Sequence, residues 1–228
     1  MAKELLKKES PLRIATLLYD NILGTSATLP VEMLRTAEAA ARPKNPNTRK
    51  IEALTLSIDE NSITSPSGFD IRPSTTIDDS RTFDIINLPA LWRNPRPALV
   101  KYKNYIPWLK KQATQGAIFI AVGTGVCFLA ESGLLDKQPA TTHWHYFDQF
   151  NKDYPNVLLK RQYFITQAGN LYCAASVNAM AELMVHLSAR LYGRSAAKQV
   201  ERNFFHEIRS SFKPTSYFSD DVEQHPDE

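Results

Sequence analysis

The chain has 228 residues, 43% of them hydrophobic and 22% charged, which excludes a disordered protein and fits one substantial α/β domain with a short appendage. The 27 Lys and Arg residues exceed the 24 Asp and Glu by only three and are scattered, so composition alone does not indicate a nucleic-acid partner. Two cysteines in separate predicted elements, no signal-peptide pattern and no apolar run near the roughly 20 residues of a membrane span predict a reduced, cytoplasmic protein without membrane contact.

Strands alternate with helices along the predicted chain. Apolar runs rich in β-branched residues predict buried strands at residues 12–18, 51–58, about 83–88 and 117–122. The stretch around "QAGN" predicts a hairpin, and the stretch around "SPSG" a hairpin or a small β excursion. The alternation predicts a largely parallel sheet with helices on both faces, whose ligands collect at the carboxyl ends of the strands. We therefore expect the turns after these strands to converge on one pocket.

The predicted helices are marked by proline and glycine. One begins at Pro30, because proline is favoured in a first turn, and a second runs from about 97 to 115 with a kink or break at Pro107. Three more helices are predicted. One spans 125–132, one begins after Thr142, which would be its N-cap, and one spans 175–192 and ends before Gly193. After a last helix, the chain from about residue 213 is polar, acidic and rich in turn formers.

The stretch "AIFIAVGTGVCFLAESGLL" has the strand, glycine turn and helix of a nucleophile elbow. The reactive residue of an elbow lies two positions before the glycine at which strand and helix meet, so Gly125 puts Gly123, which has no side chain, at the corner. Thr124 lies one position off the corner, and Cys127 falls in the helix, where we expect a packed, inert thiol. A dinucleotide fingerprint would need glycine at Phe128, and the Walker A ending is absent, so we expect no cofactor. The helix N-terminus and its glycines still favour binding of an anion.

Histidines are the other candidate functional residues. In a helix, His143 and His145 would point to different faces, so we expect no joint metal ligation. His143, near the helix start, is a candidate pocket residue, and Trp144 is interpreted as core. We interpret His186 and His206 as structural or surface residues, because neither has acidic or cysteine companions at ligand spacing. The sequence therefore predicts no metal site.

Three segments carry a family resemblance: "GTGVCFLAESGLLDKQPATTHW", "PVEMLRTA" and "AGNLYCAASVNAMAELMVHL". Over roughly residues 12–205 the chain resembles the glutamine-amidotransferase-like (PfpI-type) domain at the N-terminus of many AraC/XylS-type transcription regulators. The resemblance implies a flavodoxin-like three-layer sandwich with a mostly parallel sheet, of the class I glutamine-amidotransferase type. It also implies a sensor domain over 1–205, with 206–228 as an extension or linker toward a DNA-binding domain outside this chain.

Catalytic members of that superfamily use an elbow cysteine, an acid, a histidine and a glycine-rich oxyanion turn. Carried over by position, the cysteine falls on Gly123 and the acid on Ser26. The oxyanion glycines fall on Ala90 and Leu91, and only the histidine keeps its counterpart, in His143. Without thiolate and acid there is no covalent intermediate, so the resemblance implies a catalytically silent binding pocket.

We therefore expect a catalytically inactive domain that senses a small-molecule effector and forms a homodimer. DNA would be contacted through a helix-turn-helix domain outside this chain. The pocket is expected to be lined by Ser26, Pro30, Ala90, Gly123, Thr124 and His143. Two alternatives stay open: an active hydrolase, deglycase or lyase that uses Cys127, Thr124 or a histidine, and a stand-alone scaffold protein with a vestigial pocket.

Overall fold

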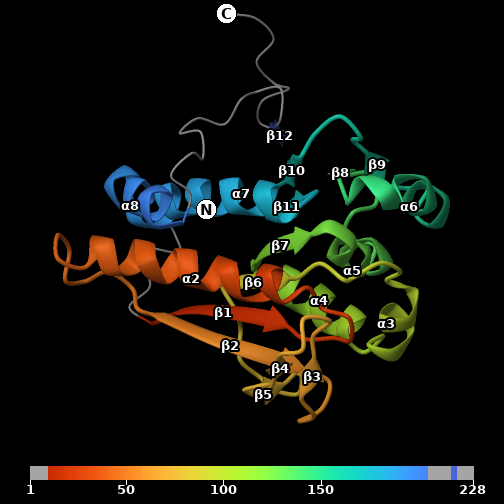
Figure 1. Ribbon diagram of the computed structural model, residues 1–228, viewed down its shortest axis with the longest axis horizontal. Coiled ribbons are helices and arrows are strands. Elements are labelled where there is room, and N and C mark those ends of the chain that lie inside the picture. Colours follow the sequence, from red (N-terminus) through yellow and green to blue (C-terminus); the bar gives the residue numbers. More distant parts are fainter. Residues whose placement is uncertain (1–9, 205–216, 220–228) are drawn as a thin grey trace, which may run out of the picture.

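A single eight-stranded sheet organises the molecule. The computed structural model describes residues 10–204 and 217–219 (Figure 1). The strands run in the order β12-β10-β11-β7-β6-β1-β2-β5. Their bounds are Leu12–Leu17 (β1), Ile51–Ser57 (β2), Thr75–Thr76 (β5), Ile85–Leu88 (β6), Ile118–Val122 (β7), Ile165–Ala168 (β10), Leu171–Ala174 (β11) and Tyr217–Ser219 (β12). All neighbours are parallel except β10 and β11, which pair antiparallel.

The central five strands, β2-β1-β6-β7-β11, have the flavodoxin-like order 2-1-3-4-5, which confirms the predicted fold. The antiparallel pair β10–β11 is the hairpin predicted around "QAGN". The pair predicted around "SPSG" is also present, as Ile63–Thr64 (β3) and Asp70–Ile71 (β4). A third short pair joins Pro139–Ala140 (β8) and Leu158–Leu159 (β9).

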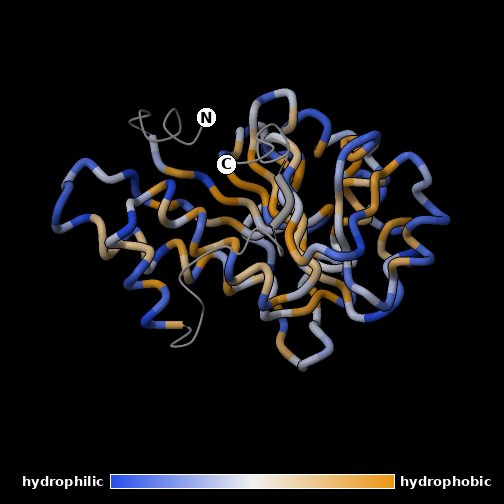
Figure 2. The backbone as a smooth tube through the Cα atoms, turned by 90° about the horizontal axis from the view of Figure 1, so that it is seen from above, coloured by the Kyte–Doolittle hydropathy of each residue, from blue (hydrophilic) through white to orange (hydrophobic). Residues whose placement is uncertain are grey.

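Helices cover both faces of the sheet. On one face lie Gly24–Ala41 (α2), Val177–Tyr192 (α7) and Arg194–Phe204 (α8), which pack against one another. On the other lie Arg96–Lys101 (α3), Tyr105–Thr114 (α4), Val126–Glu131 (α5) and Phe147–Asp153 (α6). The hydrophobic segments gather along the middle of the molecule, and the hydrophilic loops lie outside them (Figure 2).

Strand β7 shows why the sheet is buried on both sides. Its five residues are all buried; Ile120 and its alternate neighbours pack toward α2 and α7, while Phe119 and Ala121 pack toward α4 and α5. A continuous apolar run is therefore required here, because alternating side chains point to opposite, equally covered faces.

The start of helix α2 differs from the prediction. The helix begins at Gly24, so Pro30 lies inside it rather than in its first turn. Proline there removes the N–H that would bond to the carbonyl four residues earlier, that of Ser26. Asn87 of β6 compensates, because its side-chain Nδ2 donates to Ser26 O at 3.0 Å. The proline is tolerated because a strand side chain satisfies the freed carbonyl.

The helix expected at 97–115 is broken, as predicted, but the break lies before Pro107. Helix α3 ends at Lys101 and α4 begins at Tyr105. Pro107 then falls in the first turn of α4, where a missing N–H costs nothing.

Helix α7 ends at Tyr192 and is followed, as predicted, by Gly193, whose φ of +89° is one that glycine adopts readily. Its methionines, Met180 and Met184, are fully buried in the core, as expected. The last helix is present as α8, whereas most of the predicted extension over 206–228 lies outside the described residues. Within the part of the chain that the structure describes, no helix is long and apolar enough to cross a membrane.

Candidate functional site

The glycine turn after β7 has the backbone of a nucleophile elbow. Gly123 occupies the corner with φ +50°, and one 3₁₀ turn over Gly123–Gly125 leads directly into α5. A Cβ on Gly125 would lie 2.2 Å from Pro89 O, so only glycine allows strand and helix to approach this closely. The corner therefore has the elbow shape but no side chain, as the sequence count predicts.

The loops after β1 and β6 are joined at the carboxyl edge of the sheet. The N–H of Leu23 donates to Ala90 O at 2.8 Å, and the N–H of Trp92 donates to Asn21 O at 2.7 Å. This short ladder lies where the strand order reverses, the usual ligand position in such sheets. It fixes the backbone that carries Trp92 and Arg93.

The two amides that the resemblance assigns to an oxyanion turn are already engaged. Ala90 N–H donates to Ser26 Oγ at 2.9 Å, and Leu91 N–H donates to Thr124 Oγ1 at 3.2 Å. Both hydroxyls also donate, that of Ser26 to Leu23 O at 2.7 Å and that of Thr124 to Leu91 O at 3.0 Å. Each hydroxyl is thus held as donor and acceptor, which leaves neither poised to attack a substrate.

Thr142 does not cap a helix, contrary to the prediction. Its Oγ1 donates to Gly123 O at 2.8 Å and so braces the elbow. The chain continues through one 3₁₀ turn, Trp144–Tyr146, before α6 begins at Phe147, and no side chain caps the turn.

The two histidines face each other, because His143 is extended (φ −67°, ψ 135°) rather than helical. Their Nδ1 atoms lie 2.5 Å apart, so the expectation that the rings point apart was wrong. Burial and the neighbouring His145 lower the pKa of His143. Trp144 is 74% exposed, so its interpretation as core was also wrong. His186 lies partly buried on α7, and His206 lies outside the described residues.

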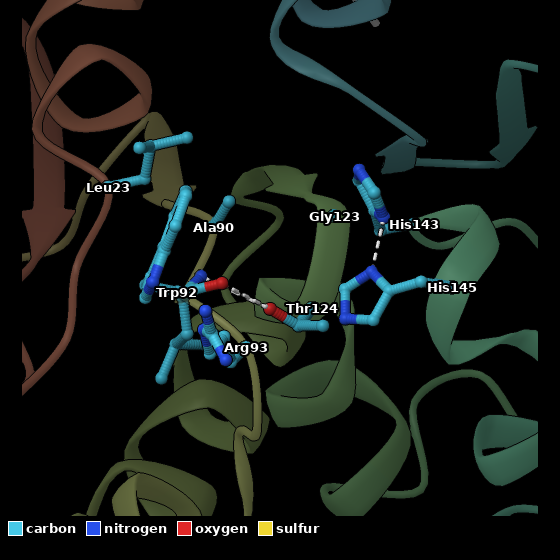
Figure 3. Close-up of a pocket in the computed structure, with 9 residues that line it drawn as sticks. Leu23, Ala90, Trp92, Arg93, Gly123, Thr124, His143 and His145 are labelled. Carbon is cyan, nitrogen blue, oxygen red and sulfur yellow. Dashed lines mark hydrogen bonds between the residues drawn. The ribbon is translucent and has the colours of Figure 1, made fainter.

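These segments enclose a pocket of about 350 Å³. Its lining is Leu23, Ala90, Leu91, Trp92, Arg93, Gly123, Thr124, His143 and His145 (Figure 3). We call four of these the floor: Ala90, Leu91, Gly123 and Thr124. We call four others the rim: Trp92, Arg93, His143 and His145. The expected convergence of the turns is confirmed.

Four of the six residues expected at the pocket line it: Ala90, Gly123, Thr124 and His143. Ser26 is fully buried and braces the floor from behind, and Pro30 lies inside α2, so neither belongs to the lining. The sequence did not predict the other five lining residues, which are Leu23, Leu91, His145 and, at the rim, Trp92 and Arg93. Trp92 and Arg93 could have been identified from their position shortly after the strand predicted at 83–88, because ligands collect at the carboxyl ends of parallel strands.

Cys127 is fully buried behind the elbow, in the core, as expected. Desolvation raises the pKa of its thiol well above the usual value, and nearby Asp153 and Glu131 act in the same direction. A buried thiol that resists ionisation is a poor nucleophile. Within residues 10–204 and 217–219, no group of three or more His, Cys, Asp or Glu side chains could hold a metal ion.

The chain is similar in sequence to transcription regulators and, over a shorter stretch, to an enzyme. Two HTH-type transcriptional regulators of Pseudomonas aeruginosa are similar: CdhR, 30% identical over 65% of this chain and 43% of its own, and GbdR, 26% identical over 88% and 52%. Isonitrile hydratase of Pseudomonas putida is 28% identical over 61% of this chain and 59% of its own. The chain thus spans about half the length of the curated regulators it matches.

The fold is shared with solved structures. The crystal structure of an AraC family transcriptional regulator from Pseudomonas putida superposes with a TM-score of 0.70 at 23% identity, covering 84% of this chain and 98% of that one. The model of the DJ-1/PfpI family matches residues 13–190, which is most of the sheet and its helices. The chain therefore belongs to the DJ-1/PfpI family and is similar to HTH-type transcriptional regulators over part of their length.

Proposed function

We propose that this chain is the effector-sensing, dimerising domain of a cytoplasmic AraC-type transcription regulator and that it catalyses no reaction. One observation carries the proposal: the floor has the form of an elbow site, yet its corner is Gly123 and its two candidate oxyanion amides are bonded to Ser26 and Thr124. A pocket that lacks a nucleophile at its corner, and whose Ala90 and Leu91 amides are already bonded, retains binding as its remaining use.

Among the described residues, neither Cys127 nor Thr124 is placed to replace the missing nucleophile. Cys127 is fully buried, and its raised pKa keeps it protonated. The hydroxyl of Thr124 is held by both backbone groups of Leu91. Activating it would require breaking two buried hydrogen bonds, each worth about 1 kcal/mol net.

Regulation would follow from linkage. An effector that binds one dimer arrangement more tightly shifts the population toward it and so changes the spacing of attached DNA-binding domains. Dimerisation and DNA binding are proposed from the similarity to regulators that are about twice as long as this chain.

A thermal-shift screen of small metabolites tests the proposal. A specific effector at about 100 times its Kd stabilises the fold by about 2.7 kcal/mol, a shift of several degrees. The Trp92→Ala and Arg93→Gln variants should lose the shift, because both residues belong to the rim. A broad library that stabilises neither the wild type nor the variants would instead favour a scaffold with a vestigial pocket.

A second candidate function, turnover of a small substrate, is favoured by the similarity to isonitrile hydratase. We expect no loss of an alkyl isonitrile in the presence of the wild type or of Gly123→Cys, as followed by mass spectrometry. The added cysteine would still face a floor in which the amides of Ala90 and Leu91 are occupied. Turnover by the wild type would refute the proposal, and turnover by Gly123→Cys alone would show that only the nucleophile is missing.

A further inference from the structure

We propose that the pocket takes a small organic carboxylate, with the carboxylate held between Arg93 and the His143–His145 pair and the apolar body against Trp92. This inference rests on the proposed function, since it names the ligand class of the same pocket. It is carried by the charge of the rim, by the backbone that holds Arg93, and by the contact between the two imidazoles.

The charge of the lining has one sign. Its nine residues include one arginine and two histidines, and none is an aspartate or a glutamate. Among the described residues, no acidic side chain pairs with Arg93, whereas the nearby Arg96 bonds to Asp153. A guanidinium without a counter-ion at a pocket mouth favours a planar anion that can accept two N–H bonds.

The backbone of Arg93 is held in a costly conformation. Its φ is +67°, a left-handed value that residues other than glycine and asparagine rarely adopt. The preceding residue is tied down, because Trp92 N–H bonds to Asn21 O at 2.7 Å. The ladder thus fixes where the arginine side chain starts, on one side of Thr124, while the two imidazoles lie on the other side (Figure 3).

The imidazole pair adds a hydrogen-bond donor. With Nδ1 atoms 2.5 Å apart, one ring donates its Nδ1 proton and the other accepts it. The accepting ring must then carry its own proton on Nε2, so the pair keeps an N–H donor even when it is neutral. When the pair takes up one more proton, it becomes a cation opposite Arg93.

Apart from Thr124 and the backbone of Gly123, the rest of the lining is apolar. Leu23, Ala90 and Leu91 supply aliphatic surface, and the indole of Trp92 is 53% exposed beside them. A volume of about 350 Å³ suits a small molecule with a compact apolar body. The combination of polar cationic groups and apolar walls distinguishes an organic carboxylate from an inorganic anion.

Three ligands of one shape test the charge preference: benzoate, benzamide and benzylammonium, with inorganic phosphate as a fourth probe. Their affinities for the full chain are measured by ligand-observed NMR at pH 7. We expect benzoate to bind at least tenfold more tightly than benzamide or benzylammonium, and more tightly than phosphate. Arg93→Gln should weaken benzoate at least fivefold and change benzamide less than twofold.

Two further variants control for folding and for general charge. Arg35→Gln removes an exposed arginine of α2 outside the pocket and should leave all four affinities unchanged. Arg93→Gly removes the guanidinium from a position whose φ suits glycine, so it should fold and still lose the benzoate preference.

Equal binding of benzamide or benzylammonium, binding of phosphate alone, or an unchanged benzoate affinity in Arg93→Gln would overturn the carboxylate assignment. The first result would leave the proposed sensing function intact, because the pocket would still bind a small molecule. Failure of all four probes, together with an empty metabolite screen, would overturn both.

Discussion

The floor and the rim of the pocket share one site and differ in their hydrogen bonding. Backbone groups of Ala90, Leu91 and Gly123 in the floor are bonded by hydroxyls of buried Ser26, Thr124 and Thr142. In the rim, Trp92 and Arg93 are exposed, and the side chain of Arg93 has no partner among the described residues.

This difference separates stability from function within one pocket. A buried group that is satisfied internally stabilises the fold and has little left to offer a substrate. An exposed, unpaired group contributes little to folding and is available to a ligand. Substitutions in the floor should therefore affect stability, and substitutions in the rim should affect binding.

The largest effect is expected at the glycine that supports the floor. A Cβ at Gly125 would meet Pro89 O at 2.2 Å and Leu88 O at 2.6 Å, and both are backbone atoms that cannot rotate away. Gly125→Ala should lower the free energy of unfolding by about 3 kcal/mol, measured by urea denaturation. Gly169→Ala is the control. Its φ is +56°, but an added Cβ would have nothing within 4 Å, so this substitution should lower the free energy of unfolding by about 1 kcal/mol.

A smaller effect is expected at the hydroxyl inside the floor. Thr124→Val keeps the shape and leaves the N–H and C=O of Leu91 without their partner, so it should cost about 2 kcal/mol in the same assay. Trp92→Ala in the rim should change the free energy of unfolding by less than about 0.5 kcal/mol and abolish ligand binding. If Trp92→Ala were the more destabilising of the two, the contrast between floor and rim would fail.

Removing strain from the rim should change stability in the opposite direction. Arg93→Gly relieves a left-handed backbone and should raise the free energy of unfolding by about 0.5 kcal/mol while binding is lost. Lys137→Gly, at φ +60° outside the pocket lining, should give a similar gain with binding retained. A loss of stability in Arg93→Gly would mean that the guanidinium supports the fold.

The smallest effect concerns acid stability. The folded protein lowers the pKa of His143 below the 6.5 of an unfolded histidine, because burial and His145 both oppose its charge. This contribution to stability is therefore present above pH 6.5 and is lost as pH falls through the folded pKa. The urea midpoint of His143→Gln should fall less between pH 7 and pH 5 than that of the wild type. Parallel pH curves would show that the histidine pair carries no such cost.

The central strands of the sheet were predictable because their signals are local, whereas the edge strands β5 and β12 were not predicted. The continuous apolar run of β7 indicates a strand that is buried on both faces. Gly123 and Gly125 indicate a tight turn, because one has a positive φ and the other packs closely against backbone. Boundaries set by distant partners were not predictable. The start of α2 depends on Asn87, which lies 61 residues from the carbonyl that it satisfies.

The rim was the hardest part to predict for the same reason. The contact between His143 and His145 depends on an extended backbone where a helix was expected. The placement of Arg93 depends on a ladder to the loop after β1, far away in sequence. The missing side chain at Gly123, by contrast, was predictable by counting back from Gly125, and the acid position was placed on Ser26 by the family resemblance.

One measurement tests the central claim, that this pocket binds without reacting. The full chain is dialysed against a metabolite library, and the retained compounds are identified by mass spectrometry beside the Arg93→Gln and Thr124→Val variants. We expect a carboxylate that is recovered unchanged in mass, retained by Thr124→Val under conditions where this variant folds, and lost in Arg93→Gln. Recovery of a converted product, or equal retention by Arg93→Gln, would contradict it.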